Sequence, residues 1–319
     1  MDPLISVAII TYNQREFLKE CIDSVLEQDY QNKEIIVSDD CSTDGTIDLL
    51  KKYQNEYPGI FKIVLSPKNN GVTANSNLAL FACKGKYVAL IAGDDLMLTS
   101  KLSKQVKYME TNPDCSICFH DVEYLINDIL SVNYCDSRLQ NPNYRSVAKL
   151  IEINFIPASS VVVRLSDIPK NGFNTRLPIV SDWLFSIETA MNGKIGFINE
   201  VLGRYRKHVN NISNNYERCF PDFFQTLAII DETWPSYSKN TKKSRSNLYR
   251  SLGFRKLRMN EKSLGRKLLL ESFRLNYFNW KSIACLSMSL FSAKLISKIF
   301  ARRTVNKIKT RYSSDQQKP

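Results

Sequence analysis

The sequence predicts an α/β fold, with a mostly parallel sheet flanked by helices, and three observations support this prediction. Short apolar runs alternate with helical patterns through roughly the first 120 residues. The runs are unbroken rather than alternating, which is typical of strands buried on both faces. Each run gives way to a polar stretch and then to a helix, as in right-handed βαβ units.

The elements follow from these patterns in chain order. Residues 5–10 form a β-branched apolar run, and the apolar residues that recur between 17 and 26 have helical spacing. Further strands are expected at 34–37, 61–65 and 86–92, and further helices start at 46 and 73. From 115 onward the pattern is less regular, and beyond Cys219 it is mostly helical; here we expect strands at 160–163 and 196–202 and a helix at 181–191.

Charge divides the chain unevenly. Residues 1–235 contain 23 Lys and Arg against 29 Asp and Glu, whereas residues 236–319 contain 21 against 3, within a net charge of +12. We therefore expect an α/β domain over 1–215 and a helical, strongly basic region over 216–319. Such asymmetry suggests an anionic partner, and without a nucleic-acid-binding motif a phospholipid surface is favoured over nucleic acid.

The stretch 282–293 is uncharged and is followed by the basic residues Lys294, Lys298, Arg302, Arg303, Lys307, Lys309 and Arg311. It is shorter than the roughly 18 residues of a membrane span, but it suits the membrane interface. The alternative is a helical subdomain whose basic face is solvated. We expect a cytoplasmic protein, peripheral on the inner face of the plasma membrane.

Cysteine usage agrees with a reducing compartment. Of the eight cysteines only Cys115 and Cys118 have metal-site spacing, and no second pair completes a zinc site. We expect reduced, mostly buried thiols, as in the cytosol. We also expect no signal peptide, because the N-terminus lacks a basic stretch followed by a long apolar one.

Polar residues follow three of the predicted strands. Thr11, Tyr12 and Asn13 follow the first, Asp39 and Asp40 the second, and Asp94 and Asp95 the fourth. In parallel sheets, ligands bind beyond the carboxyl ends of the strands. Adjacent carboxylates repel each other, and a divalent cation such as Mg²⁺ or Mn²⁺ relieves this repulsion while bridging them to phosphate oxygens. A solvated turn is the alternative for each acidic pair.

Two further residues have the chemistry of a transferase. Asp182 stands at an expected helix start, where it is either a helix cap or a general base that removes a proton from an attacking hydroxyl. His208 lies beside Arg206 in a cationic stretch suited to a diphosphate, although a single histidine is more often structural.

In this order the motifs resemble the inverting nucleotide-sugar glycosyltransferases of family 2, which have the Rossmann-like GT-A fold. The resemblance lies in SVAIITYNQREFLKECIDSVLEQDYQNKEIIVSDDCSTDGT (6–46), NNGVTANSNLAL (69–80), KGKYVALIAGDDLM (84–97), SDWLF (181–185) and RYRKHVNNIS (204–213). It implies that Thr11, Tyr12 and Asn13 line a nucleotide pocket and that Asp40 contacts the base, with Asp39 beside it. It further implies that Asp94 lies near the ribose and Asp95 on the metal, that Asp182 is the base, and that Arg206 and His208 close over the diphosphate.

Three positions depart from the family pattern. Ala92 stands where an Asp is common, Ser181 where a Glu often precedes the base, and Ser76 where an Arg is common. The function implied is transfer of a hexosyl or N-acetylhexosaminyl group, from a UDP-sugar, to a glycan or lipid-diphosphate-linked acceptor in bacterial surface polysaccharide (O-antigen or capsule) synthesis. Two alternatives stay open: a non-catalytic glycan- or lipid-binding module with a degenerate site, and another nucleotide-using transferase. The second of these would need a glycine-rich phosphate-binding loop near the N-terminus, and the sequence has no such loop there.

Overall fold

The computed structural model describes residues 2–126, 129–133 and 137–290. The chain divides into two compact units. The first comprises Met1–Leu150 and Asn154–Thr226, and the second comprises Ile151–Ile153 and Leu227–Pro319. The basic residues from Lys294 onward, and the end of the uncharged stretch 282–293, lie outside the described residues.

The first unit contains the predicted sheet. Its first four long strands confirm the sequence prediction: β1 (Ile5–Thr11), β2 (Lys33–Asp39), β3 (Phe61–Leu65) and β4 (Tyr87–Ala92). They are parallel, in the order β3-β2-β1-β4, with Ile10 beside Ala92 and Thr11 beside Asp39. The register therefore places the carboxyl ends of β1, β2 and β4 at one edge of the sheet.

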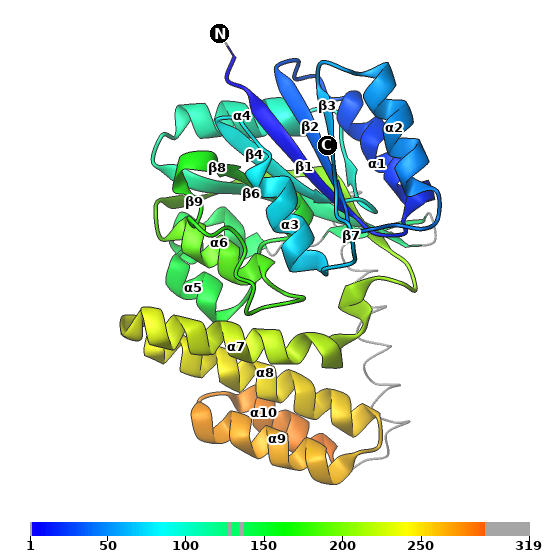
Figure 1. Cartoon of the computed structure of the whole chain (residues 1–319). Helices are drawn as coiled ribbons and strands as arrows, with labels where there is room; N and C mark the ends of the chain where they lie inside the picture. The colour runs from blue at the N-terminus through cyan, green and yellow to red at the C-terminus, as the bar shows by residue number, and fades with distance from the viewer. Residues whose placement is uncertain (1, 127–128, 134–136, 291–319) are drawn as a thin grey trace, which may run out of the picture. The chain divides into compact units, whose positions relative to one another are not determined.

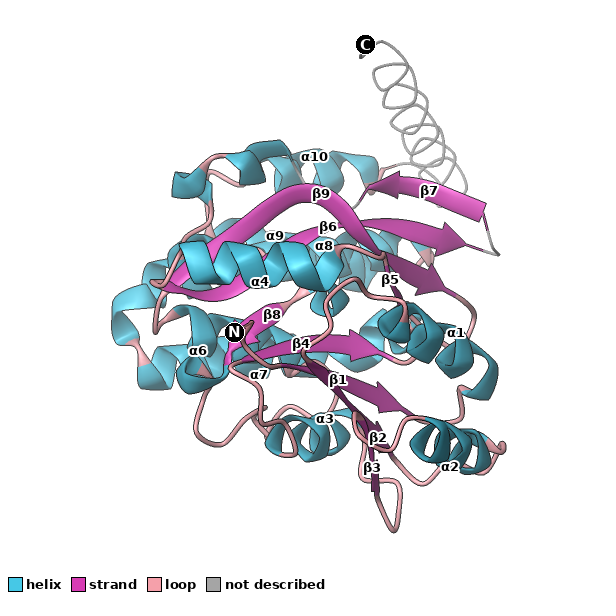
Figure 2. Cartoon of the chain, turned by 90° about the horizontal axis from the view of Figure 1, so that it is seen from above, coloured by secondary structure: helices cyan, strands magenta, loops and turns pink. Residues whose placement is uncertain are grey.

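Helices cover both faces of these strands (Figures 1 and 2). The helices α1 (Arg15–Leu26), α2 (Thr46–Glu56) and α4 (Lys101–Thr111) share one apolar core with β1, β2 and β4. The helix α3 (Val72–Phe81) contributes nothing to that core and contacts β1 and β2. This split follows from right-handed crossovers, because the chain steps from β1 to β3 in one direction and returns to β4 in the other.

The rest of the sheet is mixed. The strand β8 (Val162–Arg164) is antiparallel to β4 and to β6 (Cys115–Ile126), and β6 is parallel to β9 (Lys194–Lys207). The two-residue strand β5 (Leu96–Met97) is antiparallel to β9, and β7 (Ile129–Asn133) is antiparallel to β6. The order along the described sheet is β3-β2-β1-β4-β8-β6-β9-β5, with β7 beside β6.

Two strand predictions need correction. The strand expected at 196–202 is β9, which is longer and includes Arg204 and Arg206. These arginines are tolerated in a strand because Glu123 and Glu20 pair with them. The strand expected at 160–163 begins two residues later, after a 3₁₀ turn at Ala158–Ser160. The helix expected at 181–191 is confirmed as α6 (Asp182–Ala190), which α5 (Val147–Glu152) precedes in the chain.

The second unit is helical. The helix α7 (Tyr216–Thr233) enters it, and α8 (Ser238–Arg258), α9 (Lys262–Leu275) and α10 (Trp280–Met288) complete its described part. A Cβ atom at Gly253 of α8 would lie 2.9 Å from the Gly265 carbonyl oxygen of α9, so glycine permits this close approach. Leu257, Leu269 and Cys285 form its small core. No helix in the described part of the chain is long and apolar enough to cross a membrane.

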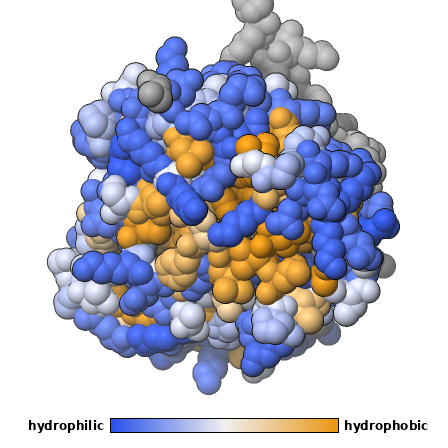
Figure 3. Space-filling view, turned by 45° about the horizontal axis from the view of Figure 1, so that its top comes forward, coloured by the Kyte–Doolittle hydropathy of each residue, from blue (hydrophilic) through white to orange (hydrophobic). Residues whose placement is uncertain are grey.

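Some large apolar side chains stay exposed. Leu78 and Phe81 of α3 are examples in the first unit, where α3 is apolar around much of its circumference. Figure 3 shows one face of the molecule, on which apolar residues gather between hydrophilic ones. Single exposed apolar residues are normal on a folded protein, so these alone define no binding surface.

Lys101 of α4 is an unusual feature of the interior. Its side chain is fully buried, and its Nζ atom has no hydrogen-bond partner among the described residues. Burial lowers the pKa of Lys101 from its ordinary value of 10.5 to about 7, because the ammonium loses its hydration. The unfolded chain therefore binds more protons than the folded chain between about pH 7 and pH 10.

We expect Lys101→Met to stabilise the protein most at pH 7 and below, by about 5 kcal/mol as an upper bound from the fall of the Lys101 pKa from 10.5 to about 7. Wild-type stability should rise as the pH rises from 7 to 10, and the variant should lose this rise. Urea unfolding measured at pH 6, 8 and 10 tests the prediction. Equal pH slopes in the two proteins would refute it.

Candidate active site

Two buried carboxylates follow β4. Asp94 and Asp95 are almost fully buried, and they come directly after Gly93. A Cβ atom at Gly93 would lie 3.1 Å from the Ile10 carbonyl oxygen and 3.1 Å from Leu18 Cδ1. Glycine therefore lets the end of β4 pass close to β1, which brings the acidic pair to the sheet edge where β1 and β2 also end.

Asp95 is held by the protein at both oxygens. Its Oδ1 accepts a hydrogen bond from the Arg206 backbone N–H at 2.9 Å, and its Oδ2 accepts one from the Ser159 hydroxyl. Burial, together with the charge of Asp94, raises the pKa of Asp95 well above its usual range. A positive charge bound here would stabilise the ionised form.

Asp94 contacts the segment that follows β9. Its Oδ2 lies 2.9 Å from Nε2 of His208 and accepts a hydrogen bond from Nδ2 of Asn211 at 3.0 Å. Its backbone carbonyl accepts one from Nε of Arg206 at 3.0 Å. The other carboxylate oxygen, Oδ1, takes part in none of these contacts. The structure therefore brings together four predicted residues: Asp94, Asp95, Arg206 and His208.

Residues of α1 support this cluster. The Arg206 guanidinium forms an ion pair with Glu20 and lies over the Phe17 ring, 4.8 Å from its centroid. The Phe17 and His208 rings are 4.7 Å apart between centroids. Since Arg206 is buried, the carboxylate of Glu20 and the face of Phe17 replace the water that its charge would otherwise bind.

The residues after β1 form a hydrogen-bonded turn. Asn13 adopts the left-handed region with φ of 51°, which asparagine tolerates better than most residues. Its backbone N–H donates to the Ser42 hydroxyl at 2.8 Å, and its side-chain oxygen accepts from the Thr43 N–H at 2.8 Å. The Thr11 carbonyl accepts from Nδ2 of Asn75 in α3 at 3.2 Å. Tyr12 stays about half exposed.

Asp39 and Asp40 are both buried and both accept hydrogen bonds from neighbouring loops. Asp39 accepts from the Ser42 hydroxyl at 2.5 Å and from the Ser42 N–H at 2.8 Å. Asp40 accepts from the N–H groups of Asn70 and Gly71, at 2.9 and 2.8 Å. The two carboxylates therefore stabilise the loops after β2 and β3 through these hydrogen bonds. The sequence alone did not predict this structural role.

Asp182 is the first residue of α6, as expected from the sequence. The Thr73 hydroxyl of α3 donates to the Leu177 carbonyl at 2.5 Å, and its oxygen accepts from the hydroxyl of the preceding Ser181 at 2.8 Å. Burial raises the pKa of Asp182, which makes its carboxylate a better proton acceptor. The hydrogen bonds of Asp94 and Asp95 described above do not include Asp182.

Sequence reasoning missed four residues of the cluster, namely Phe17, Glu20, Ser159 and Asn211. Phe17 and Glu20 fit the pattern of an ordinary amphipathic helix, and no motif in the sequence includes Ser159. Asn211 was present in the quoted stretch RYRKHVNNIS, three residues after His208, and its side chain also accepts a hydrogen bond from the His208 N–H at 2.5 Å. That local polar spacing was the only sign available.

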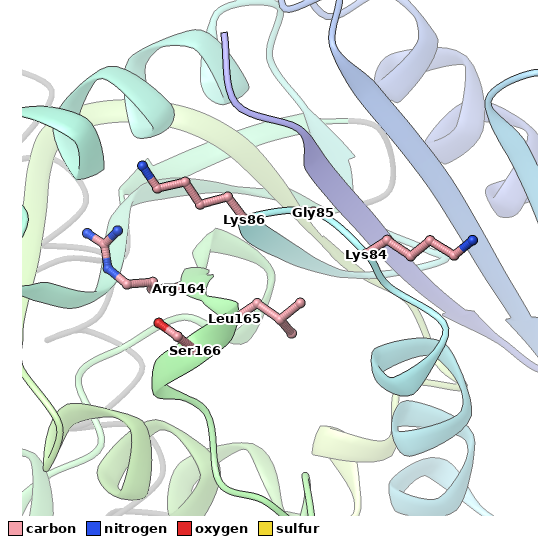
Figure 4. Close-up of a pocket in the computed structure, with 6 residues that line it drawn as sticks. All are labelled: Lys84, Gly85, Lys86, Arg164, Leu165 and Ser166. Atoms are coloured by element: carbon pink, nitrogen blue, oxygen red, sulfur yellow. The ribbon is translucent and has the colours of Figure 1, made fainter. Parts of the chain in front are cut away.

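A hollow lies elsewhere on the first unit. It has a volume of about 380 Å³ and is lined by Lys84, Gly85, Lys86, Arg164, Leu165 and Ser166 (Figure 4). These residues precede β4, end β8 or directly follow β8, whereas Asp94 follows the other end of β4. Two of its three cations have acidic partners, since Lys86 pairs with Glu110 at 2.6 Å and Arg164 with Asp167 at 3.5 Å. The hollow is not part of the acidic site.

A divalent cation fits the donor set at Asp94 and Asp95. No group of three or more His, Cys, Asp or Glu side chains within the described residues is arranged to hold a metal by itself. Mg²⁺ and similar ions, however, are usually bound by one or two carboxylates together with substrate phosphates and water. The buried Asp95, with its raised pKa, is the kind of carboxylate that such an ion stabilises.

The arrangement described so far defines a class: an α/β protein with a polar ligand edge and a paired-acid site, as in the GT-A fold. Two solved structures support the fold. The Staphylococcus aureus TarS 1-349 structure in complex with UDP-GlcNAc has a TM-score of 0.67 at 18% identity, and the match covers 89% of this chain and 90% of that one. The Pyrobaculum calidifontis mannosyltransferase PcManGT, in complex with GDP-Man and Mn²⁺, has a TM-score of 0.62 at 17% identity, covering 98% and 83%.

Sequence comparison gives the family. Residues 6–161 match the model described as glycosyl transferase family 2. The chain is 29% identical over 258 residues to the putative teichuronic acid biosynthesis glycosyltransferase TuaG of Bacillus subtilis, covering 76% of this chain and 98% of that one. It is 37% identical over 216 residues to an uncharacterized protein of Mycobacterium tuberculosis, covering 65% of this chain but only 60% of that protein. Residues 6–161, nearly all in the first unit, therefore form a glycosyltransferase family 2 domain.

Proposed function

We propose that the protein transfers a sugar from a nucleoside-diphosphate donor, with UDP the favoured nucleotide, to a hydroxyl of a glycan or lipid-linked acceptor. The transfer inverts the anomeric centre and serves bacterial surface polysaccharide synthesis, in an O-antigen or capsule. The observation that carries the proposal is the joining of Asp94 and Asp95 to Arg206 and His208 at the carboxyl edge of the sheet. The TuaG name supports the polysaccharide context.

Each predicted residue has a role in this proposal. Asp95 and Asp94 would hold Mg²⁺ or Mn²⁺, which when bound neutralises negative charge on the departing diphosphate. Tyr12, half exposed after β1, offers a face for the base, beside Thr11 and Asn13. Asp40 would contact the base through lone pairs beyond the bonds described, with Asp39 beside it at the same edge. Arg206 and His208 would border the diphosphate.

The chemical step needs one base. Asp182 accepts the proton of the acceptor hydroxyl as that oxygen forms a bond to the anomeric carbon. The bond from the anomeric carbon to the diphosphate oxygen breaks on the opposite face, and the nucleoside diphosphate leaves with the bonding electrons. The transition state resembles an oxocarbenium ion, as in glycoside hydrolysis, and a single displacement inverts the configuration. Holding the two substrates in line supplies much of the acceleration.

A donor screen tests the proposal. Purified full-length protein is offered a panel of UDP-, GDP- and dTDP-sugars together with Mn²⁺, with bacterial membrane extract as acceptor, and release of nucleoside diphosphate is measured. We expect release with one UDP-hexose or UDP-N-acetylhexosamine, dependent on the acceptor. Binding of UDP without transfer to any acceptor would instead favour a non-catalytic glycan- or lipid-binding module.

We expect Asn211→Ala to weaken Mn²⁺-dependent UDP binding by about tenfold, the usual loss for a residue that orients a metal ligand. The Asn211 amide joins Oδ2 of Asp94 to the backbone N–H of His208, so its removal frees both. Isothermal titration with UDP and Mn²⁺ measures the effect. Asn215→Ala, in the same segment but without a contact to Asp94, is the matched control and should bind as wild type does. Equal affinities in both variants would remove Asn211 from the site.

A further inference from the structure

We propose that the turn between α9 and α10, together with the outward face of α10, inserts into the interface of an anionic phospholipid surface. This aromatic anchor comprises Tyr277, Phe278, Trp280, Ile283 and Leu290. The inference deepens the proposed function and rests on it for the lipid-linked acceptor that would make a membrane surface useful. The sequence prediction placed membrane association in the uncharged stretch 282–293 and the basic residues after it; the anchor shares Ile283 and Leu290 with that stretch and adds the aromatic turn before it.

The anchor is unusually exposed. Phe278 has 93% of its surface open to solvent and Trp280 has 67%, and they are separated by a single residue. Ile283, one helical turn further on, is 53% exposed. Isolated exposed apolar residues are common, but two large aromatic residues and an isoleucine lie exposed within six positions here, beside the exposed Lys281. Such a cluster is expected to be covered when the protein works.

The helix α10 exposes part of its apolar surface. Its buried face carries Ser282, Cys285 and the following Ser289, whereas Trp280, Ile283 and Leu290 face solvent at helical spacing. The buried serines are engaged: the Ser282 and Ser272 hydroxyls lie 2.7 Å apart, and Ser289 Oγ accepts from Arg266 Nε at 2.9 Å. Small polar residues, together with the partly buried Leu286 and Met288, thus pack α10 onto its neighbours, whereas Trp280, Ile283 and Leu290 remain exposed.

The turn that presents the aromatic residues is held in place. The buried side chain of Asn279 donates to the Ser246 hydroxyl of α8 at 2.9 Å. The Phe278 N–H donates to Oδ1 of Asn276 at 3.2 Å, and the Tyr277 ring meets the Phe273 ring edge-on at 5.3 Å. Phe278 and Trp280 are therefore displayed by an ordered turn on each side of an anchored Asn279.

Charge identifies the occupant as an anionic lipid surface. Residues 236–290 contain 13 Lys and Arg against 2 Asp and Glu, and residues 291–319 contain 8 against 1. Aromatic residues beside basic ones suit the interface, where rings enter the headgroup region and cations meet lipid phosphates. A second copy of this chain would bring the same positive charge against itself, which opposes pairing through this face.

Sedimentation with vesicles tests the proposal on the full chain. Vesicles of phosphatidylcholine with about 30% phosphatidylglycerol, and of phosphatidylcholine alone, are compared at low salt. We expect wild type to bind the anionic vesicles, and the double variant Phe278→Ser and Trp280→Ser to bind them at least about tenfold more weakly. Phe81→Ser removes an exposed aromatic of α3 and is the matched control, which should bind as wild type does.

Tryptophan fluorescence gives an independent readout. Trp183 is buried and Trp234 is only partly exposed, whereas Trp280 is largely exposed, so the blue shift expected on adding anionic vesicles should be lost in Trp280→Phe and kept in Trp234→Phe. The anchor is refuted if the double variant binds the vesicles as tightly as wild type, or if wild type does not bind them at all. It is also refuted if wild type forms dimers that the double variant does not form. Binding of UDP with Mn²⁺ is measured on the same samples. If wild type binds UDP but not the anionic vesicles, the anchor is refuted and the proposed function stands. If wild type binds the vesicles but not UDP, the proposed function is refuted and the anchor stands.

Discussion

Asp182→Asn should leave donor binding intact and lower the transfer rate by about a thousandfold, within the range for loss of a general base. The amide has nearly the same shape as the carboxylate, so α6 and its Ser181–Thr73 contact should persist. It cannot accept the acceptor proton. UDP affinity by titration and kcat for UDP release, measured on the same protein, separate binding from chemistry.

The pH profile sharpens this test. Because burial raises the pKa of Asp182, the acid limb of kcat/KM should lie above the range of an exposed aspartate, with activity lost as the pH falls through that pKa. Glu188 of the same helix also titrates high, since burial raises its pKa to about 7. Glu188→Gln is therefore the control, and the acid limb of its kcat/KM profile should lie at the same pH as in wild type. If Asp182→Asn transfers sugar at the normal rate, or if only Glu188→Gln shifts the acid limb of the kcat/KM profile, another residue is the base.

Asp95→Ala should abolish the effect of Mn²⁺ on UDP affinity. In wild type we expect Mn²⁺ to tighten UDP binding by about a hundredfold, because the ion joins the carboxylates to the phosphates. Asp95→Asn keeps an acceptor oxygen for the Arg206 N–H, and its new amide NH2 can donate to the Ser159 hydroxyl oxygen, so it separates loss of charge from loss of folding. Titrations with and without Mn²⁺ measure both variants.

Asp167→Asn is the matched control for this pair of variants. Asp167 pairs with Arg164 and lies by the hollow at the other end of β4, so its charge should not affect nucleotide binding. An unchanged Mn²⁺ effect in Asp95→Ala would contradict the metal assignment and favour a binding module without catalysis.

The first half of the sheet could be predicted because its information is local. Apolar runs such as those of β1 and β4 are bounded by polar turns and followed by helical spacing, and these features do not depend on distant residues. The acidic pair and Asp182 could also be located, since their types and positions at element ends carry chemical meaning. The register of β1, β2 and β4 then brings their ends together.

The second half of the sheet was harder because its strands depend on distant partners. The residues of β9 include Arg204 and Arg206, which are unfavourable in a buried strand until Glu123 and Glu20 supply opposite charge from 81 and 186 positions away. The roles of Ser159 and Phe17 could not be predicted for the same reason, because they arise only from contacts with residues distant in the sequence. Asp39 and Asp40 show the converse, since the sequence marks them as polar ligands but not as acceptors for the Ser42, Asn70 and Gly71 groups.

The place of β9 in the sheet bears on how the protein can be shortened. In the strand order β9 lies between β6 and β5, yet it comes from Lys194–Lys207, beyond the family match at 6–161. An expression clone cut at residue 161 would leave β6 and β5 with bare backbone donors and acceptors, which invites sheet-to-sheet association between molecules. Soluble fragments for crystallisation or screening should therefore retain at least the chain through Thr226, where the first unit ends.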